Sequence, residues 1–204
     1  MVSARASSRL FILARHAEST ANTAQVVSSN PMQPVPLTAH GKQQARALGE
    51  QLANLQVDLA VSTRFLRTQE TIEVALHERV VPTTIDPDFD EVRTGDLDGA
   101  PMDVYWSWKE EHGWDAPFPR GESVNDALRR YAAAIRRVLD RSERVVLIVA
   151  HEFGLRSVGT GASGGSFPLP QLGAWEHAVP YLFDAHALCR AADRLERVAA
   201  GRRH

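Results

Sequence analysis

The stretch that decides the fold is residues 10–22, which read LFILARHAESTAN. The consecutive apolar residues 10–13 predict a short buried strand. Arg15 and His16 follow where this strand ends, and further polar side chains come within the next helical turn. Buried strand ends rarely carry such groups without a partner for them, so the stretch indicates a functional site. The alternative is a surface turn in which both side chains are merely solvated.

Length and composition place the chain among ordinary soluble proteins. It has 204 residues, of which 44% are hydrophobic and 24% are charged, with a net charge of −2. This length is enough for a full core, and we expect one domain over residues 1–204. The charge gives no reason to expect nucleic acid or an anionic membrane as a partner. The lone Cys189 excludes an internal disulfide and any multi-cysteine metal site.

Neither a signal peptide nor a membrane span is expected. The apolar run after the first arginines is too short for a signal-peptide core, and no segment is long and apolar enough to cross a bilayer. We therefore expect a cytoplasmic protein whose residues 1–8 are disordered. Its oligomeric state cannot be predicted from the sequence.

Strand-like and helix-like segments alternate along the chain. Further strands are expected at 57–62, 81–86 and 144–150, and helices at 39–55, up to about 75, at 102–114, at 124–141 and from about 184. Thr38 and Ser123 are the expected N-caps of two of these helices. The alternation predicts a three-layer α/β/α sandwich with a mainly parallel sheet. Ligands of such sheets bind beyond the carboxyl ends of the strands.

Charged and imidazole side chains follow three of the expected strands. The first strand leads to Arg15 and His16, the second to Arg64 and Arg67, and the clearest strand, RVVLIVA, runs directly into His151. Arginine presents paired donors to phosphate oxygens, and histidine can act as a nucleophile or a proton carrier near neutral pH. Together with a carboxylate from the acidic loop 87–101, these residues predict a site for an anionic tetrahedral ligand.

Five motifs in this order resemble the histidine phosphatase superfamily, the phosphoglycerate mutase-like proteins. They are LxRHxESTxN near the N-terminus, PLTxxGxxQA from Pro36, SxxxxRTxxT from Ser62, ExxxGxxxG from Glu91, and GES followed later by VLIVAH. The resemblance covers about residues 9–158. One departure is Ala17, which stands where the family usually has a glycine after the first histidine.

The resemblance implies a phosphatase that works through a phosphohistidine. His16 is then the nucleophile, Arg15, Arg67 and His151 bind the phosphoryl oxygens, and Glu91 is the general acid and base. The substrate is a small phosphate ester. Covalent catalysis by a side chain removes the need for a metal, so no metal and no cofactor are expected. A phosphoglycerate-type mutase and a non-catalytic phosphate-binding module are the alternatives.

Several candidates near the site have more than one interpretation. Arg64 either reaches phosphate or is a solvated helix-start residue. Glu18 is more consistent with a structural ion pair than with the acid, whereas three aspartates of the acidic loop compete with Glu91 for that role: Asp90, Asp96 and Asp98. The three tryptophans at 106, 108 and 114 are either core or lid residues, or they contact an aromatic leaving group. The histidines at 112, 177 and 186 are left as surface or core residues.

The remaining candidates concern substrate binding. Asn22 is expected to donate a neutral hydrogen bond, and Glu122 and Ser123 are included because GES resembles a family motif. Glu152 stands where the family often has a small residue, and it either raises the pKa of His151, binds a cationic part of the substrate, or faces solvent. The GxGxxG pattern at 159–164 lacks a preceding strand, so we expect a flexible loop over the site instead of a dinucleotide site.

Overall fold

The computed structural model describes residues 9–167 and 175–202, and the predicted disorder of residues 1–8 lies outside this range. Within it the strands are β1 (Leu10–Arg15), β2 (Leu59–Ser62), β3 (Thr83–Ile85), β4 (Val145–Ala150) and β5 (Pro180–Asp184). The α-helices are α1 (Thr20–Ala24), α2 (Ala39–Gln51), α3 (Leu66–Ala75), α4 (Met102–His112), α5 (Val124–Leu139), α6 (Glu152–Ser163) and α7 (Ala185–Ala199). Two short 3-10 helices lie in the acidic loop, at Pro87–Phe89 and Gly95–Leu97.

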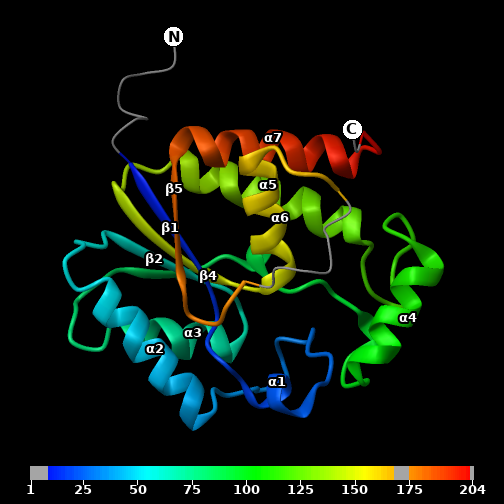
Figure 1. Cartoon of the computed structure of the whole chain (residues 1–204), viewed down its shortest axis with the longest axis horizontal. Helices are drawn as coiled ribbons and strands as arrows, with labels where there is room; N and C mark the ends of the chain where they lie inside the picture. Colours follow the sequence, from blue (N-terminus) through cyan, green and yellow to red (C-terminus); the bar gives the residue numbers. More distant parts are fainter. Residues whose placement is uncertain (1–8, 168–174, 203–204) are drawn as a thin grey trace.

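The strands form one sheet in the order β3-β2-β4-β1-β5 (Figure 1). All neighbouring strands are parallel except β5, which runs antiparallel to β1 at the edge. The register pairs Arg15 at the end of β1 with Ala150 at the end of β4. The side chains that follow these strands therefore emerge next to each other.

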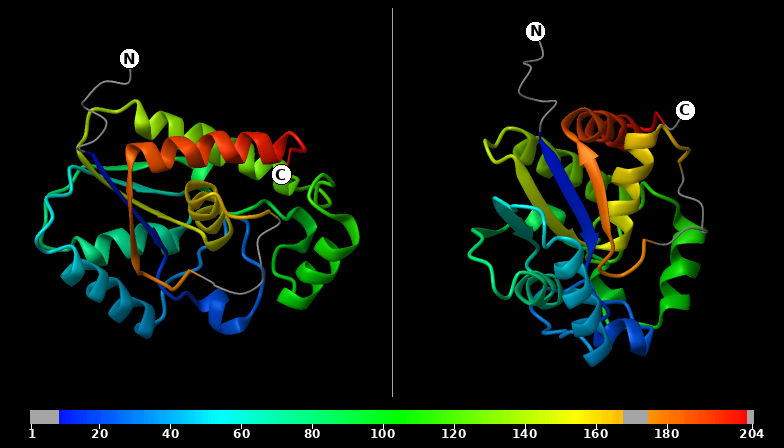
Figure 2. Two further views of the ribbon diagram at one scale, coloured as in Figure 1. Left: turned by 45° about the horizontal axis from the view of Figure 1, so that its top comes forward. Right: turned by 60° about the vertical axis from the view of Figure 1, so that its left-hand side comes forward.

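Helices cover both faces of the sheet, which confirms the predicted α/β architecture (Figures 1 and 2). Residues of β1 alternate between two cores, as the two-residue period of a strand requires. Phe11 and Leu13 pack in the core beneath α5, α6 and α7, whereas Ile12 and Ala14 pack in the core with α2 and α3. No helix among the described residues has the length and apolar character that crossing a membrane requires.

N-capping side chains explain where helices α2 and α5 begin. Thr38 accepts a hydrogen bond from the Gly41 amide at 2.9 Å. Ser123 and Asp126 form a reciprocal capping box at the start of α5. Both N-caps agree with the prediction, because each side chain satisfies an amide that has no partner within the helix.

The predicted flexible loop at 159–164 is wrong, because residues 159–163 form the last part of α6. Glycines of this segment let neighbouring residues pack closely against the helix. A Cβ at Gly159 would lie 2.7 Å from the Trp175 ring, and one at Gly161 would lie 3.1 Å from the Cα atom of Ala191 in α7. Only the last glycine of the pattern, Gly164, has a left-handed backbone, and it ends the helix.

Two other features of the structure differ from what the sequence predicted. Trp114 lies beyond the end of α4, where Gly113 breaks the helix with a positive φ, and the indole is buried in the core. Strand β5 was not predicted at all. Its residues are only partly buried because it lies at the sheet edge, so the hydrophobic alternation that marks a strand is weak there.

Candidate active site

The site lies at the carboxyl edge of the parallel strands. Arg15 and His16 come from the end of β1, Arg67 lies in the first turn of α3 after β2, and His151 is the N-cap of α6 after β4. Glu91 comes from the acidic loop. These five predicted residues are brought together, and all except His151 line a pocket of about 400 Å³.

The hydrogen bonds of His16 define which of its ring nitrogens is unprotonated. Its Nδ1 lies 2.8 Å from the Ala17 carbonyl, and its Nε2 lies 3.1 Å from Nε of Arg67. Because the carbonyl only accepts and the guanidinium only donates, the proton is on Nδ1 and the lone pair is on Nε2. Burial, followed by the charges of Arg67 and Arg15, holds the pKa of His16 well below its ordinary value of 6.5.

Arg67 connects the two histidines. Besides His16, its Nη2 donates to Nδ1 of His151 at 3.2 Å, and its other N–H groups donate to the hydroxyl and carbonyl oxygens of Ser28. All these acceptors are neutral, and no carboxylate within the described ranges forms an ion pair with this buried guanidinium. A buried cation with only neutral partners favours an anionic ligand. Burial lowers the pKa of Arg67 only to about 10, so it stays charged at neutral pH.

Thr63 orients His151 from the other side. The threonine hydroxyl lies 3.1 Å from Nε2 of His151 and 2.8 Å from the Thr68 hydroxyl, and it accepts from the Phe65 amide. Since Arg67 donates to Nδ1, the neutral ring carries its proton on Nε2 and donates it to Thr63. Burial and the nearby charge of Arg67 hold the pKa of His151 well below 6.5.

Glu91 is the only carboxylate of the acidic loop that lines the pocket. Its three predicted competitors each have a partner elsewhere: Asp90 pairs with Arg64, Asp96 with Arg120, and Asp98 accepts from the Ser29 amide. Burial raises the pKa of Glu91 above its ordinary value of 4.5, although the Val92 amide and the Arg67 charge oppose this rise. A carboxyl that keeps its proton at higher pH suits a general acid.

Arg15 and Glu152 form an ion pair inside the pocket, with Nη1 and Oε2 2.8 Å apart. Nη1 of Arg15 also donates to the Trp175 carbonyl at 3.1 Å. Its Nε atom is buried and has no hydrogen-bond partner within residues 9–167 and 175–202. Glu152 therefore lines the site, and within the described ranges its ion-pair partners are Arg15 and Arg156. It does not raise the pKa of His151, which is lowered.

Three predicted substrate-binding residues do not line the pocket. Arg64 pairs with Asp90 at 2.6 Å, Ser123 caps α5, and Glu122 is buried between the guanidiniums of Arg93 and Arg130. Arg130 also donates to three backbone carbonyls of the acidic loop, those of Asp88, Asp90 and Glu91. Glu122 therefore acts on the site indirectly, because it orients the arginine that holds this loop.

The side chains of Asn22 and Glu18 each contact the residue that caps the start of a helix. Asn22 lines the pocket, but its Oδ1 atom accepts from the Ser19 amide and hydroxyl, which closes the N-terminus of α1. Glu18 accepts from the Thr38 hydroxyl at 2.6 Å, and no ion pair involving it occurs within the described ranges. The contact of Glu18 is therefore structural, as expected, but it is a hydrogen bond and not the predicted ion pair.

Three residues at the site were not singled out in the sequence. Ser28 binds Arg67, and Lys109 lines the pocket from α4. His177, which the sequence left as a surface or core residue, donates from Nδ1 to the His16 carbonyl at 2.7 Å, with the two ring centroids 5.5 Å apart. The histidine type was the one available signal for His177, but nothing in the sequence indicated that residues 175–184 return to the site.

Comparison with known proteins identifies the class to which this fold and site belong. The sequence profile of the histidine phosphatase superfamily (branch 1) matches residues 11–178. The chain is a member of this superfamily, as its motifs suggested. Among its relatives are both phosphatases and phosphoglycerate mutases.

Two relatives illustrate this range. A Bacillus subtilis (strain 168) protein named uncharacterized phosphatase PhoE is 28% identical over 154 residues, covering 75% of this chain and 77% of that protein. A 2,3-bisphosphoglycerate-dependent phosphoglycerate mutase of Bradyrhizobium sp. (strain ORS 278) is 30% identical over 168 residues, covering 74% and 80%.

Solved structures share the fold. A putative alpha-ribazole-5'-P phosphatase from Escherichia coli K-12 aligns with a TM-score of 0.77 at 24% identity, covering 87% of this chain and 90% of that one. A mycobacterial glucosyl-3-phosphoglycerate phosphatase solved with VO3 aligns with a TM-score of 0.69 at 23% identity, covering 85% and 92%.

Proposed function

We propose that this protein is a metal-independent phosphatase that hydrolyses a phosphomonoester through a phosphohistidine on His16. The observation that carries the proposal is the unprotonated Nε2 of His16, whose lone pair accepts a hydrogen bond from a buried guanidinium that has no carboxylate partner within the described ranges. A neutral imidazole next to donors for phosphoryl oxygens is the arrangement that phosphoryl transfer to nitrogen requires.

In the first step, Nε2 of His16 attacks phosphorus in line. A nitrogen–phosphorus bond forms as the bond from phosphorus to the alcohol oxygen breaks, and Glu91 gives its proton to that oxygen. Arg15, Arg67 and His151 stabilise the charge on the phosphoryl oxygens. The raised pKa of Glu91 supports this role, because the carboxyl retains a proton to donate.

In the second step, the Glu91 carboxylate takes a proton from a water molecule that attacks phosphorus. The nitrogen–phosphorus bond breaks, inorganic phosphate leaves, and His16 and protonated Glu91 are restored. One carboxyl thus serves as acid and then as base. No step needs a metal, because the guanidiniums supply the positive charge.

A phosphoglycerate-type mutase is the second candidate, favoured by relatives that carry that name at 30–32% identity. It would use the same residues but return the phosphoryl group from His16 to a substrate hydroxyl. Product analysis separates the two: hydrolysis releases inorganic phosphate from 3-phosphoglycerate or an aryl phosphate, whereas a mutase exchanges phosphate between the 2 and 3 positions.

The direct test is turnover of 4-nitrophenyl phosphate in EDTA by the wild type and by His16→Ala, with the exposed His40→Ala as a matched control. The proposal predicts full activity in EDTA, full activity in the control, and loss in His16→Ala. Activity that survives in His16→Ala, or that EDTA abolishes, would contradict the mechanism. No turnover by a folded wild type would favour a phosphate-binding module.

A further inference from the structure

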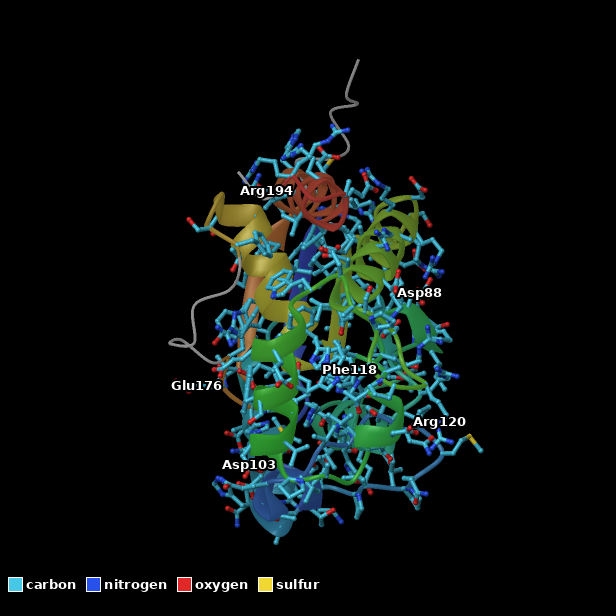
Figure 3. The ribbon with its side chains drawn as sticks, turned by 90° about the vertical axis from the view of Figure 1, so that its right-hand side faces the viewer. Asp88, Asp103, Phe118, Arg120, Glu176 and Arg194 are labelled. Carbon is cyan, nitrogen blue, oxygen red and sulfur yellow. The ribbon has the colours of Figure 1, made fainter. Side chains whose placement is uncertain are left out.

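Lys109 lies in the pocket within a cluster of aromatic rings, which we call the lysine cage: Tyr105, Trp106, Trp114 and Phe153. Its Nζ atom lies 5.5, 5.2, 5.9 and 4.9 Å from the four ring centroids, in that order. All five residues line the same pocket as His16. Figure 3 views this side of the molecule, where α4 runs from near Asp103 and Phe118 lies against it, stacked on Tyr105 and Trp108.

The ammonium of Lys109 has little else to bind. Within residues 9–167 and 175–202, its one hydrogen bond, to the Tyr105 hydroxyl, is long at 3.5 Å, and no carboxylate there pairs with it. Apart from this long bond, its N–H donors face aromatic surface, which attracts a cation but accepts hydrogen bonds weakly. A partly buried charge with spare donors in a pocket wall favours an anionic ligand group.

The other charges of the pocket are consistent with this reading. Of the three carboxylates that line the pocket, Glu91 is the one whose charge opposes the lowering of the Lys109 pKa, although no ion pair joins the two within the described ranges. Glu152 is engaged by Arg15 and Arg156, whereas Glu110 is exposed to solvent. A cationic ligand group cannot enter the cage without meeting the charge of Lys109. The cage therefore presents a positive charge surrounded by apolar surface.

We propose, building on the phosphatase function above, that Lys109 binds a second acidic group on the alcohol part of the substrate. The substrate class is a phosphomonoester with an apolar or aromatic body that carries a carboxylate or a comparable anion. The phosphate occupies the His16 end of the pocket, the body lies against the cage, and the acid meets Lys109. Burial lowers the pKa of Lys109 to about 8, which leaves the ammonium charged at neutral pH.

Non-hydrolysable phosphonates test this separately from catalysis. The dissociation constants of benzylphosphonate, 4-carboxybenzylphosphonate and 4-(aminomethyl)benzylphosphonate are measured by calorimetry at pH 7. A charge-assisted hydrogen bond predicts that the carboxylate compound binds the wild type about tenfold more tightly than the parent compound. Equal affinities, or tightest binding of the amine, would overturn the proposal while leaving phosphate hydrolysis intact.

Variants then locate the effect. Lys109→Gln should abolish the advantage of the carboxylate compound, and Lys109→Arg should retain part of it. The matched control is Lys42→Gln, which removes the only other lysine of the chain, exposed on α2. An advantage that persists in Lys109→Gln would contradict the assignment. If none of the phosphonates binds the folded wild type, the phosphate site fails, and this inference fails with it.

Discussion

The carboxylate of Glu152 and the guanidinium of Arg15 lie 2.8 Å apart in the pocket that also contains His16. Glu152 is the first residue of α6, directly after His151, and Arg156 one turn later lies 3.6 Å from its other oxygen. In the proposed mechanism Arg15 binds phosphoryl oxygens. The chain therefore supplies an anion of its own that competes with the substrate for this arginine.

Replacing Glu152 with glutamine should tighten the binding of phosphate. The change removes a negative charge that repels a dianionic substrate, so we expect KM for an aryl phosphate and the inhibition constant of inorganic phosphate to fall about fivefold. Glu110→Gln is the matched control, because this carboxylate lines the same pocket without an ion pair in the described ranges. A rise of KM in Glu152→Gln alone would show that the carboxylate orients Arg15 more than it competes.

The loss of activity in Glu91→Gln should depend on the leaving group of the substrate. The loss of the proton donor should lower kcat/KM about a hundredfold for alkyl phosphates and much less for 4-nitrophenyl phosphate, whose leaving group needs little protonation. Wild-type activity should fall as pH rises through the raised pKa of Glu91, and the variant should lack this fall. Asp96→Asn is the control, since Asp96 pairs with Arg120 at the surface. Equal losses for both substrates would argue against Glu91 as the acid.

The stability of the fold should decrease as pH falls from 7 to 5. His16 and His151 have pKa values well below 6.5 in the folded protein, so the unfolded chain binds more protons at acid pH. Each additional proton lowers the free energy of unfolding by about 1.4 kcal/mol per pH unit below 6.5. The free energy of unfolding, measured with urea at several pH values, should depend less steeply on pH for His151→Asn than for the wild type or the exposed His40→Asn. An equal pH dependence in all three proteins would contradict the conclusion that His151 is buried in its neutral form.

Gly154→Ala should destabilise the protein strongly. A Cβ at this position would lie 1.9 Å from Cζ of Tyr131, whose ring is buried and whose hydroxyl donates to the Phe89 carbonyl. Neither side can move freely, so we expect a loss of about 3 kcal/mol or more. Urea unfolding measures it, and Gly154→Ala combined with Tyr131→Leu should recover part of the loss if this contact is the cause.

The sequence predicted the residues that follow the strands and missed those that reach the site from a distance. His16, Arg67 and His151 were accessible because each follows a strand with a strong apolar signal, and parallel strands place their carboxyl ends together. His177 could not be predicted as a site residue, because the strand that follows it, β5, is a partly exposed edge strand in which apolar and polar residues alternate only weakly. Lys109 was hidden among helix residues whose spacing does not reveal which side chains face a pocket.

Where the sequence erred, the cause was tertiary packing. The glycines of the GxGxxG pattern suggested a loop, but in α6 they admit Trp175 and α7 at short distance. Glu122 was grouped with the substrate residues because of its motif, whereas its buried carboxylate binds Arg93 and Arg130. Charge and motif alone do not distinguish a side chain that meets the ligand from one that supports the loop next to it.

The most direct measurement is to trap the proposed intermediate. The enzyme is mixed with a 32P-labelled aryl phosphate, quenched in alkali within milliseconds, and digested for peptide mapping. The proposed mechanism predicts an alkali-stable, acid-labile label on the peptide that contains His16, which increases in Glu91→Gln and is absent in His16→Ala. A label on another residue, or turnover with no trapped label even in Glu91→Gln, would contradict a phosphohistidine on His16.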